Sequence, residues 1–134
     1  MQWSSVRLEL AQTPLFPKGS AARAYIVHLP LSDSGTIDAP ALQRAPASAI
    51  IRRFWPNEPD LVGFVSASDQ GWSFSCHVGP GDDERIFNLF VNRIKRGEYL
   101  TIREPDGGDM LFRVAEVLPL VTALPAGSRR LSRA

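Results

Sequence analysis

The residues of this sequence that are best suited to chemistry lie close together between positions 76 and 84. Cys76 and His77 are adjacent, and three acidic residues follow shortly after them, Asp82, Asp83 and Glu84. A thiol beside an imidazole can form a nucleophile pair, and a histidine with nearby carboxylates can bind a metal. Both uses require the side chains to share one site, so they depend on the secondary structure that carries them.

That secondary structure argues against a shared site. The segment WSFSCHV, residues 72–78, alternates between apolar and polar side chains, which predicts a strand. Neighbouring residues of a strand point to opposite faces. We therefore expect Cys76 in the core with Trp72 and Phe74, and His77 on the solvent face, with the acidic residues in a solvated loop.

The sequence also lacks the motifs of common catalytic and cofactor sites. None of G-x-S-x-G, H-E-x-x-H, G-x-G-x-x-G and G-x-x-x-x-G-K-[ST] is present. His28, the second histidine, has no carboxylates at the spacing of metal ligands. We predict no catalytic residue, no metal and no cofactor, and keep as an alternative an enzyme that uses a lone carboxylate or His77.

The most unusual local composition is RRFWPNEPD, residues 52–60. Arginines beside aromatic residues can bind phosphates and stack on bases, or anchor a protein partner. A structural alternative is that the two aromatic side chains cover one end of the fold while the arginines pair with Glu58 and Asp60. If the segment is functional, it forms a contact site of Arg52, Arg53, Phe54 and Trp55.

A second group of candidate contact residues is basic. NRIKRGEY supplies Arg93, Lys95 and Arg96, and its Tyr99 is expected near the contact site of residues 52–55. If this group converges with the arginines of residues 52–53, the chain has a basic patch despite a net charge of +1, which favours nucleic-acid binding. The alternative is ordinary mixed surface charge, because carboxylates are spread among these residues.

Length and composition describe an ordinary globular domain. The chain has 134 residues, of which 44% are hydrophobic and 22% charged, and this is enough to bury a core in one domain. One cysteine excludes an internal disulfide. The N-terminal segment lacks the pattern of a signal peptide, and no run approaches the roughly 20 apolar residues of a membrane span. These features predict a cytoplasmic protein without membrane contact.

Short strands separated by turns are expected along most of the chain. The segment DAPALQRA, residues 38–45, favours a short helix capped by Asp38 and ended by Pro46, although a plain loop fits equally well. Residues 86–94 fit both helical spacing and a bent strand. The best-specified hairpin surrounds the turn EPDGGD. The other predicted strands are residues 3–11, 22–31, 49–55, 61–68 and 72–78.

Six or seven such strands, with one or two short helical segments, predict a mainly β fold, either a small antiparallel barrel or a sandwich. The barrel is favoured because it leaves no strand edge exposed. Residues 1–126 are expected to form a single domain, followed by a basic tail at 127–134. An exposed edge strand, if one is present, could pair two copies into a homodimer.

The segments RRFWPNEPD, RGEYLTIREPDG and LFRVAEV together resemble a pattern in short bacterial, in particular proteobacterial, proteins with no assigned activity. The resemblance extends from about Leu8 to Val117 and implies a self-contained bacterial domain. It assigns no functional role to any residue of this chain. The function we expect is a binding or interaction module, with a protein or a nucleic acid as partner.

Overall fold

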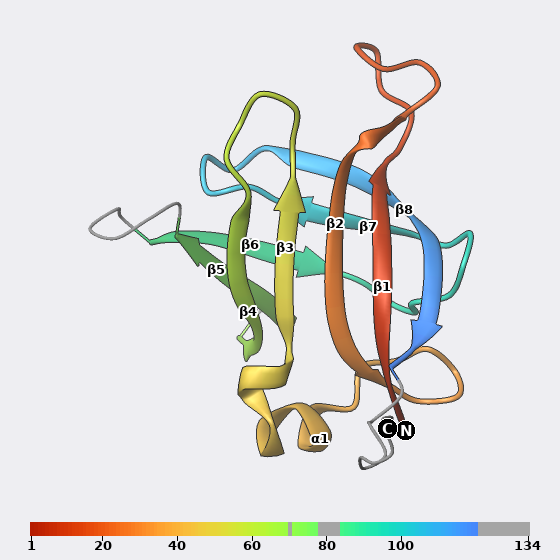
Figure 1. The fold of residues 1–134 in the computed structure, drawn as a ribbon, viewed down its shortest axis with the longest axis vertical. Helices are drawn as coiled ribbons and strands as arrows, with labels where there is room; N and C mark the ends of the chain where they lie inside the picture. The colour runs from red at the N-terminus through yellow and green to blue at the C-terminus, as the bar shows by residue number, and fades with distance from the viewer. Residues whose placement is uncertain (70, 78–83, 121–134) are drawn as a thin grey trace, which may run out of the picture.

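The computed structural model describes residues 1–69, 71–77 and 84–120, which form eight antiparallel strands closed into a barrel (Figure 1). Each strand pairs with the next along the chain, and the last pairs with the first. The predicted barrel is confirmed, and the predicted C-terminal tail, 127–134, lies outside the described residues. The strands are β1 (Gln2–Leu10), β2 (Ser20–Leu31), β3 (Ile50–Phe54), β4 (Leu61–Ser68), β5 (Gly71–His77), β6 (Arg85–Phe90), β7 (Tyr99–Arg103) and β8 (Asp109–Pro119).

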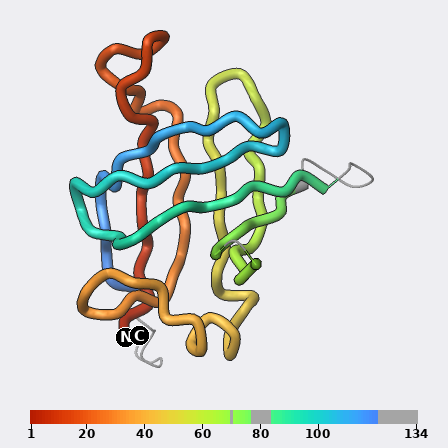
Figure 2. Tube along the Cα trace, turned by 180° about the vertical axis from the view of Figure 1, so that it is seen from behind, coloured from red at the N-terminus to blue at the C-terminus, as the bar shows by residue number. Residues whose placement is uncertain are grey.

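The barrel has two ends that differ in the connections they carry. At the end that we call the hairpin end, β1 joins β2, β3 joins β4, and β7 joins β8, and there β5 ends and β6 begins. The opposite end, which we call the helix end, carries the β2–β3 connection with α1 (Ala39–Arg44) and the 3₁₀ turn η1 (Pro46–Ser48). Strands β1–β4 form one layer, which β6 and β7 cross, as Figures 1 and 2 show from opposite sides.

The short helix begins and ends where its sequence predicts. The Asp38 Oδ1 atom accepts a hydrogen bond of 3.0 Å from the backbone amide of Ala41 and thereby caps the first turn. The helix ends at Arg44, and Pro46 opens the 3₁₀ turn. Buried Ala41 and Leu42 attach the helix to the barrel.

The ambiguous segment at residues 86–94 is a strand over its first half and not a helical turn. Phe87 lies opposite Phe74 on β5, and Leu89 lies opposite Ile102 on β7. Both Phe87 and Leu89 are buried, whereas Ile86 is exposed. The pairing on both sides satisfies the backbone polar groups of β6, and this long-range requirement decides between the two local patterns.

Aromatic side chains fill the inside of the barrel. The Tyr25 ring meets Phe74 and Phe112 edge-on, with centroid distances of 5.7 and 5.1 Å, and Phe74 stacks on Phe87 at 4.7 Å. Burial of each large apolar side chain contributes about 1.5–3 kcal/mol. The interior is therefore a packed core in most of its length.

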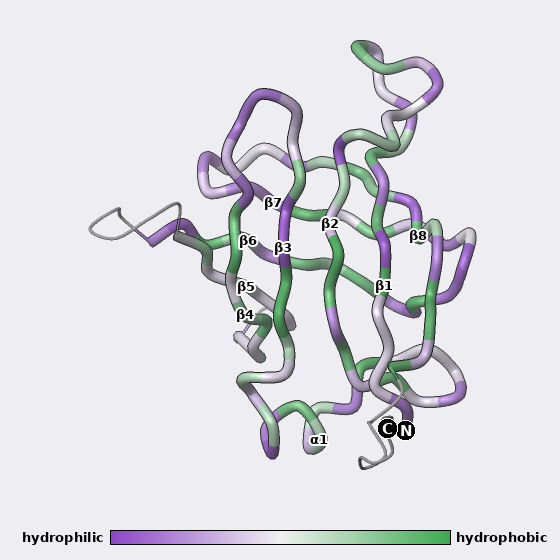
Figure 3. Tube along the Cα trace, in the orientation of Figure 1, coloured by the Kyte–Doolittle hydropathy of each residue, from purple (hydrophilic) through white to green (hydrophobic). Residues whose placement is uncertain are grey.

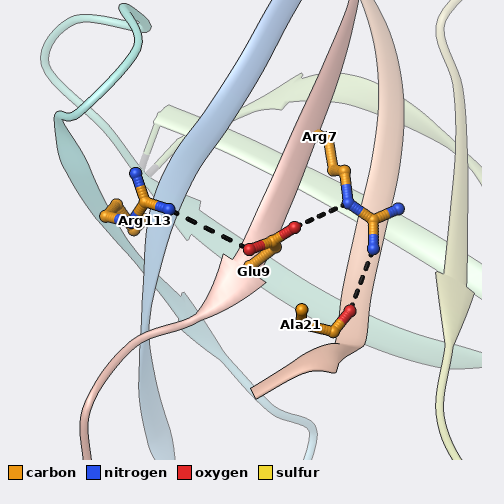
Figure 4. A network of polar contacts seen from close by, with 4 residues as sticks. All are labelled: Arg7, Glu9, Ala21 and Arg113. Atoms are coloured by element: carbon orange, nitrogen blue, oxygen red, sulfur yellow. Dashed lines mark hydrogen bonds and ion pairs between the residues drawn. The ribbon is translucent and has the colours of Figure 1, made fainter. Parts of the chain in front are cut away.

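Strand β1 is irregular toward both of its neighbours. Its register shifts against β2 between Glu9 and Leu10, and against β8 between Arg7 and Leu8. A polar network covers these bulges on the outer face: Arg7 donates to Glu9 at 2.8 Å and to the carbonyl of Ala21 at 2.9 Å, and Arg113 lies 4.0 Å from Glu9 (Figure 4). Such half-exposed ion pairs contribute little to stability. We therefore interpret the network as fixing the orientation of these side chains and not as a main source of stability.

Gly63 on β4 permits a close approach between β4 and β5. It pairs with Cys76, and a Cβ atom at this position would overlap the carbonyl oxygen of Ser75 and lie 2.9 Å from the Cys76 Sγ. The obstacle on one side is backbone, which cannot rotate away. Glycine is therefore required here by space.

We predict that Gly63→Ala lowers the free energy of unfolding by about 1–3 kcal/mol, because the added methyl group overpacks the contact between β4 and β5. Urea denaturation of the two proteins measures the difference. Ser66→Ala, at an exposed position of the same strand, should change stability by less than about 0.5 kcal/mol. An unchanged urea midpoint for Gly63→Ala would contradict the argument.

Candidate ligand-binding site at the hairpin end

The inward positions of the barrel change from apolar to polar at the hairpin end. Ile51 is followed two residues later by Arg53, Phe74 by Cys76, and Ile102 by Glu104. In Figure 3, β3 is hydrophobic near the helix end and becomes hydrophilic farther along the strand. We call this group of inward-facing residues the polar end, and it consists of Tyr25, Arg53, Cys76, Arg85 and Glu104.

Arg53 is the central residue of the polar end. Its side chain is only 10% exposed. The Nη2 atom donates a hydrogen bond of 2.9 Å to Glu58, and the guanidinium lies 5.0 Å from the centre of the Trp55 ring. The Nε atom, however, is buried and has no hydrogen-bond partner among the described residues. A buried donor in this state costs about 1–3 kcal/mol.

Tyr25 lies directly opposite Arg53 in the β2–β3 register. Its hydroxyl is buried and also has no hydrogen-bond partner of acceptable geometry in the described part of the chain. Burial raises the pKa of Tyr25 well above its ordinary value, while the positive charge of Arg53 and the closeness of its guanidinium to the hydroxyl oppose this shift. The two groups are thus near each other but not aligned for a hydrogen bond. The hydroxyl therefore stays protonated and can both donate and accept a hydrogen bond.

Cys76 lies on the same inner face and is buried, as the alternation predicts. Burial raises the pKa of its thiol to about 11, although the charges of Arg53 and Arg85 lower it in part. The thiol is protonated at neutral pH. A nucleophilic role for Cys76 is therefore disfavoured.

A small hollow opens from the polar end to solvent. Its volume is about 200 Å³, and it is lined by Arg53, Arg85, Phe87, Glu104, Pro105 and Asp106. Burial raises the pKa of Glu104, and the nearby charge of Asp106 raises it further, while Arg53 opposes both. The hollow thus combines cationic, acidic and apolar groups at the mouth of the barrel, which is a common place for ligand sites.

The turn between β7 and β8 holds the acidic side of this hollow in place. Gly107 adopts a positive φ of 92°, which glycine permits without strain. The Asp106 Oδ1 atom accepts a hydrogen bond of 2.8 Å from the amide of Gly108, and the amide of Glu104 bonds to the Gly108 carbonyl at 2.8 Å. The predicted turn chemistry of EPDGGD is confirmed.

The structure divides the first predicted contact site between two faces of β3. Arg53 is buried in the polar end, and Trp55 packs over it against Phe112, with ring centroids 6.5 Å apart. Arg52 is exposed on the outer face, and Phe54 is half-buried. Trp55 therefore covers one end of the barrel and Arg53 pairs with Glu58, which is one part of the structural alternative. The other part is not seen among the described residues, because Phe54 points away from Arg53 and no ion pair joins Arg52 to Asp60.

The second predicted group lies at the helix end. Arg93 pairs with Glu98 at 2.8 Å, and Lys95 donates to the carbonyl of Asp33 at 2.8 Å. Arg96 is exposed. Because the β6–β7 connection and the β3–β4 connection are at opposite ends of the barrel, this group does not converge with Arg53.

Tyr99 begins β7 and is 55% exposed. It lines a hollow of about 470 Å³, together with Trp72 and Phe90. Another hollow, of about 680 Å³, is lined by His28 and Trp3. Both are larger than the hollow at the polar end, but no buried polar atom without a partner is aimed into them within the described chain.

Sequence reasoning missed three residues of the polar end, namely Tyr25, Arg85 and Glu104. A signal for Glu104 is present, because it continues the inward positions of Leu100 and Ile102. The signal for Arg85 is its pairing with Cys76, which needs the register of β5 and β6. The side chains of His77, Asp82 and Asp83 lie outside the part that the structure describes.

No family model, curated protein or solved structure matches the chain. The resemblance to short bacterial proteins therefore stays a prediction. Within residues 1–69, 71–77 and 84–120, no group of three histidine, cysteine or acidic residues is arranged to hold a metal ion. In the same residues no helix has the length and apolar character needed to cross a membrane.

We predict that Arg53→Met changes the free energy of unfolding by no more than about 1 kcal/mol. The variant keeps the apolar stem and removes a buried donor without a partner, while Glu58 is half exposed and can be solvated instead. Denaturation in urea measures this. Ile51→Ala on the same strand should instead lower the free energy of unfolding by about 2–5 kcal/mol. If Arg53→Met lowers it equally, Arg53 has a mainly structural role.

We also predict that Cys76 reacts slowly with a thiol reagent such as Ellman's reagent. A pKa near 11, two units above 9.0, lowers the thiolate fraction by roughly 100-fold at pH 8. The reaction rate of the native protein should therefore be at least that much lower than in 8 M urea. Similar rates in the two conditions would contradict the buried position of the thiol.

Proposed function

We propose that this small β-barrel is a binding module for a small polar ligand, held in the hollow at the polar end. The observation that carries the proposal is the Arg53 Nε atom, which is buried and has no hydrogen-bond partner among the described residues, in a residue that lines this hollow. Such a group destabilises a fold unless something accepts its hydrogen bond. A ligand with an acceptor atom would meet this need.

Two further features support binding at this place. Arg53 is held by Glu58 and Trp55, so its donor is oriented in advance. Phe87 forms part of the apolar lining and is itself fixed by stacking on Phe74. Rigid polar groups on an apolar floor favour affinity, because little order is lost on binding.

Binding accounts for these groups better than catalysis does. The Cys76 thiol and the Tyr25 hydroxyl both have raised pKa values, so neither supplies a nucleophile or a base near neutral pH. A nucleic-acid role has less support, since the basic residues of the β6–β7 connection and Arg53 are at opposite ends of the barrel.

The test is a titration of the ¹⁵N-labelled full chain with a panel of water-soluble fragments. The fragments must be small, because the hollow has a volume of only about 200 Å³. We expect some fragments to shift the amide resonances of Arg53, Arg85 and Glu104. These shifts should disappear in Arg53→Met.

Arg52→Met is the matched control, because it removes the same group one residue away on the outer face of β3. It should retain the fragment-induced shifts. If no fragment shifts the amides of the polar end, or if the shifts persist in Arg53→Met, the proposal is wrong. If Arg52→Met alone abolishes them, the contact is on the outer face.

A further inference from the structure

The hollow is lined by charges of both signs. The cationic side chains are Arg53, near the end of β3, and Arg85, at the start of β6. The acidic side chains, Glu104 and Asp106, come from the connection between β7 and β8. We call the two arginines the cationic pole of the hollow and the two carboxylates its acidic pole.

These opposite charges form no direct ion pair across the hollow among the described residues. Within the described residues, no ion pair joins Arg53 or Arg85 to the acidic side chains of the β7–β8 connection; Arg53 pairs with Glu58 instead. The carboxylate of Glu104 has no hydrogen bond or ion pair in this part of the chain, although the residue is half-buried. Each pole thus retains unused hydrogen-bonding capacity.

The size of the hollow limits what can join the two poles. A volume of about 200 Å³ is below the range of about 300–1,000 Å³ that is usual for sites of drug-sized ligands. Phe87 and Pro105 supply an apolar wall between the poles. A compound with both charges a few atoms apart and a short apolar group matches this lining.

Building on the proposed function, we infer that the ligand is a small zwitterion of the α-amino-acid class. Its carboxylate accepts hydrogen bonds from the Arg53 Nε atom and from Arg85. Its ammonium group donates to Glu104 and Asp106. Its apolar side chain lies against Phe87 and Pro105.

Three matched compounds test this inference by isothermal titration calorimetry with the full chain. L-valine carries both charges, 3-methylbutanoate lacks the ammonium group, and 2-methylpropylamine lacks the carboxylate. Each of the last two compounds lacks the contacts of one charged group. We therefore expect each of them to bind at least about tenfold more weakly than L-valine.

Two variants assign the poles. Glu104→Gln should weaken L-valine about tenfold or more and leave 3-methylbutanoate unchanged, whereas Arg53→Met should weaken L-valine and leave 2-methylpropylamine unchanged. Glu116→Gln is the matched control for the carboxylate, because it makes the same change at an exposed position of β8. It should bind all three compounds like the wild type.

The outcomes separate this inference from the proposed function. If 3-methylbutanoate binds as tightly as L-valine, or if Glu104→Gln does not change the affinity for L-valine, the inference of a zwitterionic ligand is wrong. The site then binds anions. If none of the three compounds binds while neutral fragments still shift the polar-end amides in an Arg53-dependent way, the ligand class is wrong and the binding function stands. If the fragments also shift no amide resonance of the polar end, both the proposed binding function and the inferred ligand class are wrong.

Discussion

Closure of the sheet imposes one constraint on which the other features depend. In a barrel of eight strands every second side chain points into a narrow interior, which here is filled by four stacked or edge-on aromatic rings. A charged side chain inside that packing would lose its hydration and gain no compensating hydrogen bond or ion pair. Charged inward positions are therefore tolerated only where the barrel opens, and Arg53 occupies such a position.

Local patterns were sufficient to predict most of the strands, because alternation and turn residues are readable over short distances. The hairpin of β7 and β8 and the cap of α1 at Asp38 are clear cases. Residues 86–94 could not be assigned, because their closely spaced Phe, Val and Ile residues fit both the spacing of a helix and that of a strand. Pairing with strands that are distant in the sequence decides between the two. This unassigned segment is why six or seven strands were expected instead of eight. Closure of β8 on β1 is also not visible in local patterns, which is why a sandwich remained an alternative to the barrel.

The candidate site was predicted only in part, for a related reason. Alternation separates Arg53 from Arg52 and Phe54, so a run of four neighbouring residues could not act as one surface. The residues that do meet Arg53 are Tyr25, Arg85 and Glu104, which come from three other parts of the chain. Their convergence depends on register between strands. A buried arginine with an unused donor could be recognised only after the fold was known.

The pairing of β1 with β8 also bears on how the chain is made. Residues near position 5 meet residues near position 118, so the final ladder joins segments at opposite ends of the described chain. During synthesis β1 leaves the ribosome long before its second neighbour exists, and one of its edges stays open meanwhile. A topology with such distant contacts folds slowly. The irregular register and charged outer face of β1 would help to discourage that edge from pairing with another nascent chain.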